Sequence, residues 1–182
     1  MRNAWKFRID PKRWFPIPTV DAWTSETRKK WIEQATIIGG VAVIAQDIPV
    51  SEIRARVTEI ADTPRGMESA VFFPVAEPMP LLMHMVTDTA EAIRAAREQW
   101  HVRTNGTRAV ETTPLEGALL EDAARIARVD ADANGTIVYS IAFVGTSGEL
   151  GTVWHGSTRY PLVAGQFMSM GAEVFATVER TS

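Results

Sequence analysis

The stretch IVYSIAFVGTSGELGTVWHGST, residues 137–158, decides the fold of this chain. Its first part is rich in β-branched and aromatic residues, and polarity alternates around Tyr139 and Ser140, which is typical of a strand. The turn GTSG, residues 145–148, separates it from a second run, LGTVWHGST. The pattern predicts a meander of antiparallel strands. We therefore expect an α+β domain whose mainly antiparallel sheet is flanked by helices.

The preceding segment, DADANGT, residues 130–136, has two interpretations. Asp130 and Asp132 occupy the first and third positions of a calcium-binding loop, with Asn and Gly at the fifth and sixth. Such a loop needs a bidentate Glu at position 12 and a helix after it, whereas position 12 here is Ile141 in a predicted strand. Asn134-Gly135 instead suits a type I′ hairpin turn. We expect a hairpin, with no metal site and no cofactor.

Composition indicates the class of protein. The 182 residues are 46% hydrophobic and 23% charged, which favours one domain spanning residues 1–182. The absence of cysteine excludes disulfides, thiolate metal ligands and a cysteine nucleophile. No apolar run approaches the roughly 20 residues of a membrane-spanning helix, and the N-terminus lacks a signal-peptide pattern. We expect a cytoplasmic protein that does not insert into membranes.

Charge is distributed unevenly along the chain. The first 31 residues hold eight of the 19 Lys and Arg residues but only three of the 22 acidic residues, and they include four of the six tryptophans. Basic residues interleaved with aromatic residues occur in nucleic-acid-binding surfaces. Tryptophan is also an efficient core residue, and the acidic remainder of the chain repels phosphate. Nucleic-acid binding is therefore the less favoured interpretation.

Hydrophobic periodicity divides the rest of the chain into elements, with an irregular segment at residues 11–18. Helices are predicted from Ser25 to Gly39-Gly40, from Ser51 to near Pro64, from Asp88 to Glu98, and from Pro161 through Val174. Strands are predicted at residues 6–9, 41–46, 68–75, 81–86 and 176–179. Residues 114–131 fit either a helix that begins at Thr113-Pro114 or a strand, and both readings stay open.

No motif identifies a catalytic centre. Ser147 lies in GTSG, which lacks the second glycine of a nucleophile elbow. The three histidines have no metal-ligand partner two or four residues away: His84, His101 and His155. A pocket between sheet and helix, lined by His155, Arg159 and Tyr160, would make the chain a small-ligand binder or an enzyme. This function is the alternative to a non-catalytic domain that binds another protein.

Large flexible or aromatic side chains supply candidate contacts for a partner protein. Methionine repacks around varied shapes, and tryptophan often anchors interfaces. The competing interpretation, which is favoured for methionine, is that these side chains fill the core. The candidate partner-binding residues are Trp5, Trp14, Trp23, Met83 and Met85.

The order of elements resembles the PsbP-like superfamily of α/β/α sandwiches. The resemblance depends on KFRI near the start, VFFPV, LLMHMV, the hairpin IVYSIAFV/LGTVWHGST and the closing QFMSMGAEVFATVE. That superfamily includes a Ran-binding nuclear import factor and bacterial secretion-effector chaperones. The resemblance implies a non-catalytic domain that binds another protein, as an accessory, chaperone or immunity protein, and it assigns no binding residues.

Overall fold

The computed structural model describes residues 5–42, 48–63, 67–75 and 79–181. The chain forms two compact units, one made of residues 1–8 with 85–182 and the other of residues 9–84. The larger unit contains β1 (Trp5–Lys6), α3 (Ala90–His101), β5 (Thr107–Pro114), β6 (Glu121–Ala131), β7 (Ile137–Ser147), β8 (Leu150–Thr158), α4 (Pro161–Phe175) and β9 (Glu179–Arg180). The smaller unit contains β2 (Trp14–Ile17), the 3-10 helix η1 (Val20–Ala22), α1 (Ser25–Ala42), α2 (Val50–Asp62) and β3 (Glu68–Phe72). Strand β4 (Leu81–Thr89) contributes residues to both units.

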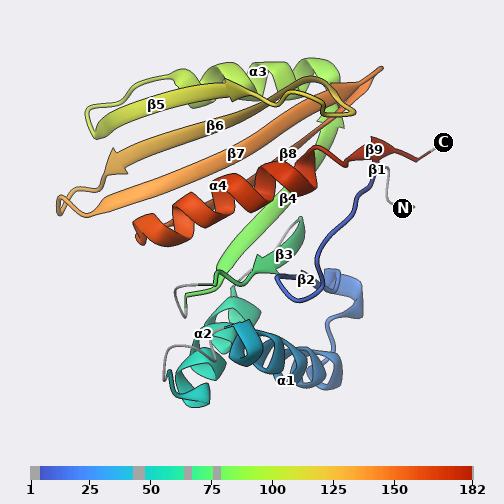
Figure 1. The fold of residues 1–182 in the computed structure, drawn as a ribbon, viewed down its shortest axis with the longest axis vertical. Coiled ribbons are helices and arrows are strands. Elements are labelled where there is room, and N and C mark those ends of the chain that lie inside the picture. Colours follow the sequence, from blue (N-terminus) through green and yellow to red (C-terminus); the bar gives the residue numbers. More distant parts are fainter. Residues whose placement is uncertain (1–4, 43–47, 64–66, 76–78, 182) are drawn as a thin grey trace. The chain divides into compact units, whose positions relative to one another are not determined.

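The predicted α+β fold class is confirmed (Figure 1). Seven strands are hydrogen-bonded in the order β2-β3-β4-β8-β7-β6-β5, and β1 pairs with β9 in a separate two-stranded sheet. The segment 114–131, which the sequence left open, ends in strand β6 rather than a helix. Within the described residues, no helix is both long and apolar enough to cross a membrane.

The predicted meander is confirmed as strands β6, β7 and β8. Strand β7 pairs antiparallel with β6 through Val129↔Tyr139 and with β8 through Phe143↔Trp154. The turn type at Asn134-Gly135 was wrong, because only Gly135 has a positive φ, of 78°. The Gly135 N–H donates to the Asp132 carbonyl at 2.9 Å, which gives a turn followed by a left-handed glycine. Gly135 is therefore the residue of this turn that adopts the left-handed backbone conformation.

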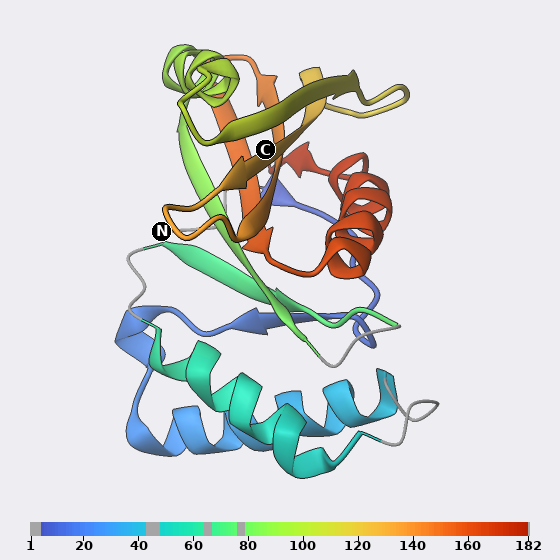
Figure 2. The same ribbon diagram turned by 90° about the vertical axis from the view of Figure 1, so that its left-hand side faces the viewer.

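The two faces of strand β7 pack against different helices. Ala142 and Val144 belong to a buried cluster with Ile93 of α3, whereas the Phe143 ring lies 5.5 Å from Phe167 of α4. Successive side chains of a strand point to opposite faces, so α3 and α4 cover opposite faces of this sheet (Figure 2). Residues 141–146 are consequently all buried.

Glycine allows α4 to approach the sheet closely. A Cβ atom added to Gly171 would lie 2.5 Å from Cε2 of Phe143, a distance that real Cβ atoms do not show. Phe143 is fully buried and its ring also packs on Phe175 at 5.8 Å, so it has little freedom to move. The Phe143 and Gly171 pair thus fixes the distance between α4 and β7.

The smaller unit corrects two predictions. Helix α1 does not end at Gly39-Gly40 but continues to Ala42, so Val41 and Ala42 are helical and not the start of a strand; residues 43–47 lie outside the described residues. A Cβ at Gly39 would lie 2.8 Å from Ile53 and 2.9 Å from Phe73. Glycine is present there because neighbouring residues pack against the helix backbone.

Strand β2 was missed because its sequence, WFPI, contains proline. It pairs only with β3 and is the last strand of the sheet, where one side of the backbone needs no hydrogen bond. Strand β5 was also not predicted. The remaining differences are shifted boundaries: β1 and β9 have two residues each, α2 begins at Val50, and Thr89 caps α3 by accepting a hydrogen bond from the Ala92 N–H.

Helix α4 has one buried glycine, Gly171, and one exposed glycine, Gly165, and the two give a matched test of this packing. Gly171→Ala is expected to lower the free energy of unfolding by about 1–3 kcal/mol, because the methyl group overpacks the contact with Phe143. Gly165 has no atom within 4 Å of an added Cβ, so Gly165→Ala is expected to raise it by about 0.5–1 kcal/mol. Urea denaturation of both variants measures this. Equal effects would contradict the assigned contact.

Candidate functional site

Three of the five candidate partner-binding side chains are buried. Trp5 is 7% exposed and its Nε1 donates to Thr87 Oγ1 at 3.0 Å; Trp14 and Met83 are 2% and 1% exposed. Trp23 and Met85 are half-buried. Trp5, Trp14 and Met83 therefore fill the core, as the competing interpretation of these residues expects. Partner binding through this set stays a prediction that no observation tests.

The alternative pocket residues do not converge on one point. His155 lies on the α3 side of β8, where its ring is 6.1 Å from that of Trp100. Arg159 is exposed and pairs with Asp132 at 3.7 Å. Tyr160 is 38% exposed and immediately precedes α4. The structure brings His155 close to Trp100, a residue that the sequence analysis did not select for a site.

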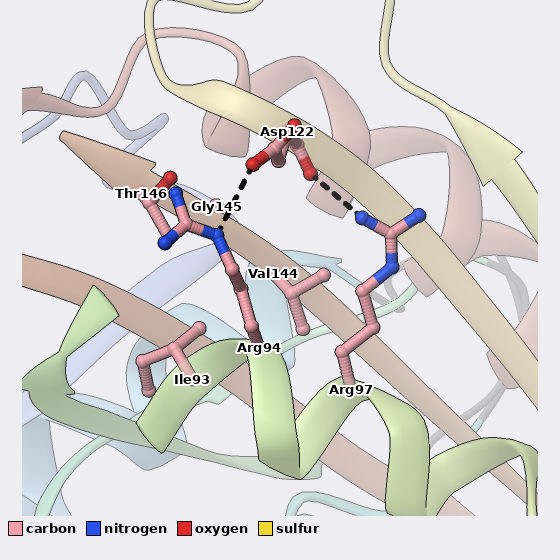
Figure 3. Close-up of a pocket in the computed structure, with 7 residues that line it drawn as sticks. All are labelled: Ile93, Arg94, Arg97, Asp122, Val144, Gly145 and Thr146. Carbon is pink, nitrogen blue, oxygen red and sulfur yellow. Dashed lines mark hydrogen bonds and ion pairs between the residues drawn. The ribbon is translucent and has the colours of Figure 1, made fainter. Parts of the chain in front are cut away.

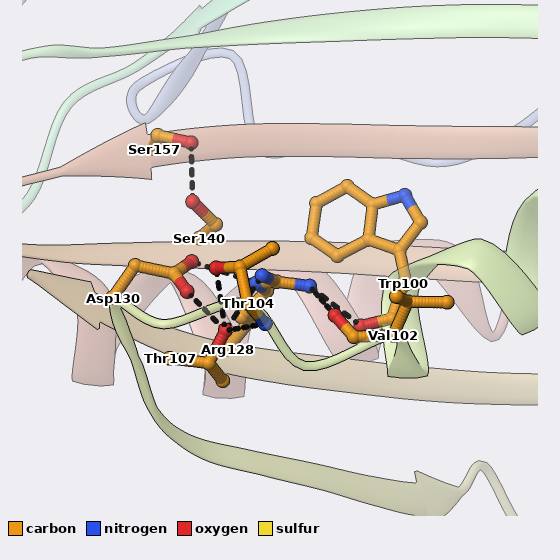
Figure 4. A network of polar contacts seen from close by, with 8 residues as sticks. All are labelled: Trp100, Val102, Thr104, Thr107, Arg128, Asp130, Ser140 and Ser157. Atoms are coloured by element: carbon orange, nitrogen blue, oxygen red, sulfur yellow. Dashed lines mark hydrogen bonds and ion pairs between the residues drawn. The ribbon is translucent and has the colours of Figure 1, made fainter.

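A polar network lies at the carboxyl end of α3 and is centred on Arg128 (Figure 4). Its Nε donates to Asp130 Oδ2 at 2.7 Å, its Nη2 donates to Thr107 Oγ1 at 2.8 Å, and its Nη1 donates to the carbonyls of Trp100 and Val102 at 3.2 and 2.7 Å. A cation that binds the last carbonyls of a helix also interacts favourably with the helix dipole. The Arg128 side chain is only 15% exposed. Its geometry stabilises the fold and leaves little of the guanidinium open to a ligand.

The two aspartates of the former calcium hypothesis have separate structural tasks. The hydrogen bond from Arg128, with a further one from Thr107, holds the pKa of Asp130 below its ordinary value. Asp132 Oδ1 accepts from the N–H groups of Thr136 and Asn134 at 2.9 Å, and these bonds lower the pKa of Asp132. Among the described residues, no group of three or more potential metal ligands was found. Both carboxylates therefore stabilise the hairpin.

Next to this network, two serines form a small polar surface on the same face of the sheet. Ser140 Oγ and Ser157 Oγ are 2.8 Å apart across strands β7 and β8. Arg128 is paired with Ser140 on the other side, so the three residues form one cross-strand row. Such a row can exchange hydrogen bonds with a ligand, but hydroxyl groups alone do not supply a general base.

The opposite face of the sheet contains a surface that no described element covers. Helix α4 packs on the buried stretch 141–146 of β7, while the start of β7 stays half-buried and β5 and β6 extend beyond the helix (Figure 1). Counting in steps of two from Phe143 along β7, and following the register into β6, places five half-buried apolar side chains on this face. We call them the open face: Ala127, Val129, Ala131, Ile137 and Tyr139. All five are only half-buried.

The border of the open face is also poor in charge. Arg125 lies on the same face and pairs with Glu111 of β5 at 4.0 Å, and its Nη2 donates to Thr113 Oγ1 at 2.9 Å. Helix α4 contains a single charged residue, Glu173, and at its start Leu162 is 58% exposed. A helix with so few charges is typical of one that is covered on more than one side.

The open face was not predicted from the sequence. The sequence does contain the alternation of a two-faced strand, since Arg125, Ala127 and Val129 alternate with the buried Ala124 and Ile126. Alternation shows that a strand has two different faces but not which of them is covered by a helix. That information comes from the position of α4.

Asp130 gives a pH-dependent test of the network. Asp130→Asn is expected to lower the free energy of unfolding by about 1–2 kcal/mol near pH 7, because Arg128 loses its charged partner. A carboxyl group with a lowered pKa in the folded state stabilises the fold above the unfolded pKa, and this contribution disappears as the pH falls through the folded pKa. The difference from wild type should therefore shrink towards about pH 3.

Asp132→Asn is the matched control in the same urea measurements. An asparagine side chain still has a carbonyl oxygen that accepts from the N–H groups of Asn134 and Thr136. The free energy of unfolding should therefore fall less than in Asp130→Asn. A pH-independent loss in Asp130→Asn would contradict the assigned ion pair.

Comparison with known proteins gives no further assignment of the site. No protein-family model, curated protein or solved structure matches the chain.

Proposed function

We propose that this chain is a non-catalytic domain that binds another protein, and that the open face is its contact surface. The observation that carries the proposal is the lack of cover on this apolar part of the sheet. Ala127, Val129, Ala131, Ile137 and Tyr139 are contiguous across β6 and β7, and none is fully buried. An apolar patch on a folded chain is a typical site of protein association.

The chemistry of the open face favours a protein over a nucleic acid or a small ligand. Arg125, a basic residue at its border, already has an acidic neighbour in Glu111, so it offers no excess positive charge for phosphate. Small side chains at Ala127 and Val129 leave the sheet surface flat, which suits a helix or strand of a partner. Tyr139 supplies an aromatic ring with a polar end, the combination enriched in interface hot spots.

The biological role that we propose is that of an accessory, chaperone or immunity protein, as the resemblance to the PsbP-like superfamily implies. Each of these roles requires a stable scaffold with one exposed recognition surface. Helix α4 is such a support, because its buried residues Phe167 and Phe175 hold it on β7. The open face lies beside it in the same compact unit.

Substitutions on adjacent residues of β7 test the proposal. Tyr139→Ala removes the aromatic ring from the open face, and we expect binding of the partner to weaken at least about tenfold. Val138→Ala is the control, since Val138 is also half-buried but points to the opposite face. Affinity co-purification of the tagged chain from its native lysate, at low and high salt, identifies the partner by mass spectrometry. Titration of the purified partner then gives the two affinities.

The outcomes separate the candidate functions. A stoichiometric protein that survives high salt and is lost only in Tyr139→Ala supports the proposal. A partner that is retained by Tyr139→Ala contradicts the open face as the contact surface. If no protein is recovered at either salt concentration, the proposal is rejected, and the small-ligand alternative around His155 becomes the better hypothesis.

A further inference from the structure

A small, partly open pocket lies between helix α3 and the start of strand β6 (Figure 3). Arg94 and Arg97 extend into it from the helix, and Asp122 faces them from the strand. Val144 and Thr146 of β7 line the pocket from the sheet. None of these residues belongs to the Arg128 network or to the open face, and no motif in the sequence pointed to them.

Helix α3 holds the two arginines in a defined position. Its first turn is capped by Thr89, and Ile93 packs so closely on β8 that a Cβ at Gly151 would lie 2.8 Å from it. Residues three apart lie on the same side of a helix, so Arg94 and Arg97 project together from this fixed support. The fixed backbone of α3 thereby places the two guanidinium groups beside one pocket.

Asp122 has an unusual backbone conformation. Its φ is 52°, and it is the only non-glycine residue with a positive φ among the residues that the structure describes. It lies at a register shift between Glu121 and Ala124 in the pairing of β6 with β7. Such bulges redirect a side chain, and a non-glycine residue in this region costs about 1 kcal/mol or more. Here the bulge presents Asp122 to the arginines.

The contacts within the pocket are nevertheless loose. Arg94 Nε donates to Asp122 Oδ2 at 3.4 Å, and Arg97 Nη1 donates to the Asp122 carbonyl, also at 3.4 Å. Well-formed charge-assisted bonds are nearer 2.7–2.9 Å. Each guanidinium has five N–H donors, so most of the donors in this pair have no partner among the described residues. The side chains of Arg94 and Asp122 are 52% and 56% exposed, and the three groups together carry a net positive charge.

We propose that this pocket binds a small oxyanion, a carboxylate or a phosphate group, between Arg94 and Arg97. An oxyanion accepts two or more hydrogen bonds from guanidinium groups in a planar geometry, which Arg provides better than Lys. The Asp122 carboxylate competes for the same donors from a strained position. The pocket is on the α3 side of the sheet and the open face is on the α4 side, so this inference does not depend on the proposed function.

Amide chemical shifts of the full chain test the site directly. Sodium phosphate, sodium acetate and sodium chloride are titrated separately at constant ionic strength, and the signals of Asp122, Gly145 and Thr146 are followed. We expect a saturable change with phosphate or acetate and none with chloride. A response to phosphate alone identifies a phosphate ligand, whereas comparable responses to both anions identify a general carboxylate and phosphate site.

Three variants relate the response to the pocket. Arg94→Gln/Arg97→Gln should weaken binding at least about tenfold, because two charge-assisted donors are lost. Arg54→Gln/Arg103→Gln, at two exposed positions outside the pocket, removes the same charge and should leave binding unchanged. Asp122→Asn removes the competing carboxylate and should strengthen binding several-fold, and asparagine tolerates a positive φ.

Circular dichroism and urea midpoints confirm that each variant is folded before the titration is interpreted. The absence of a saturable response to phosphate and to acetate in the wild type overturns the proposal. An equal loss of anion affinity in the two double-arginine variants also overturns the proposal, since the affinity would then depend on net charge and not on the pocket. A weaker response in Asp122→Asn would show that Asp122 does not compete with the anion.

Discussion

The burial of strand β7 on both faces is the constraint on which the larger unit depends. Ala142 and Val144 pack under α3, while Phe143 packs under α4. Glycines permit this close arrangement, since a Cβ at Gly171 or at Gly151 would overlap Phe143 or Ile93. Residues 141–146 of β7 are covered on both sides and have lost their contact with water, so their hydrophobic contribution is large.

The same arrangement determines where polar and exposed features are found. Helix α3 ends before the sheet does, and Arg128 binds its last carbonyls at that point. Near the other end of β6, the bulge at Asp122 faces α3 and forms the pocket with Arg94 and Arg97. On the opposite side, α4 packs on the buried part of β7 but leaves Ile137 and Tyr139 half-buried, and it does not cover the full width of the sheet (Figure 1). Each candidate surface is thus a place where the cover of the sheet stops or is distorted.

The core also explains why residue type was a poor guide to the site. Trp5, Trp14 and Met83 are of the types that often anchor interfaces, yet they are buried within the chain. Large apolar side chains contribute to a core and to an interface through the same contacts. Ala127 and Val129 are of types that usually fill a core, yet here they are half-exposed. Position in the fold, and not hydrophobicity, distinguishes the two uses.

The sequence by itself determined the elements whose signals are local. Alternating polarity and a glycine turn predict the β7–β8 hairpin, and the spacing of Val163, Phe167 and Val174 predicts α4; both are confirmed. The tertiary structure decided whether residues 121–131 form a strand, because their partner strand lies next to them only in the fold. It also decided that Pro16 lies in an edge strand and that Gly39 lies inside a helix.

The candidate sites were decided by the tertiary structure for the same reason. Arg94 and Asp122 are 28 residues apart in the chain, and only the packing of α3 on the sheet brings them together. The open face requires knowledge of which strands α4 leaves uncovered. Local patterns report the conformation of a segment because short-range hydrogen bonds and side-chain spacing fix it. Sites depend on which segments become neighbours, and that is determined by burial summed over the whole core.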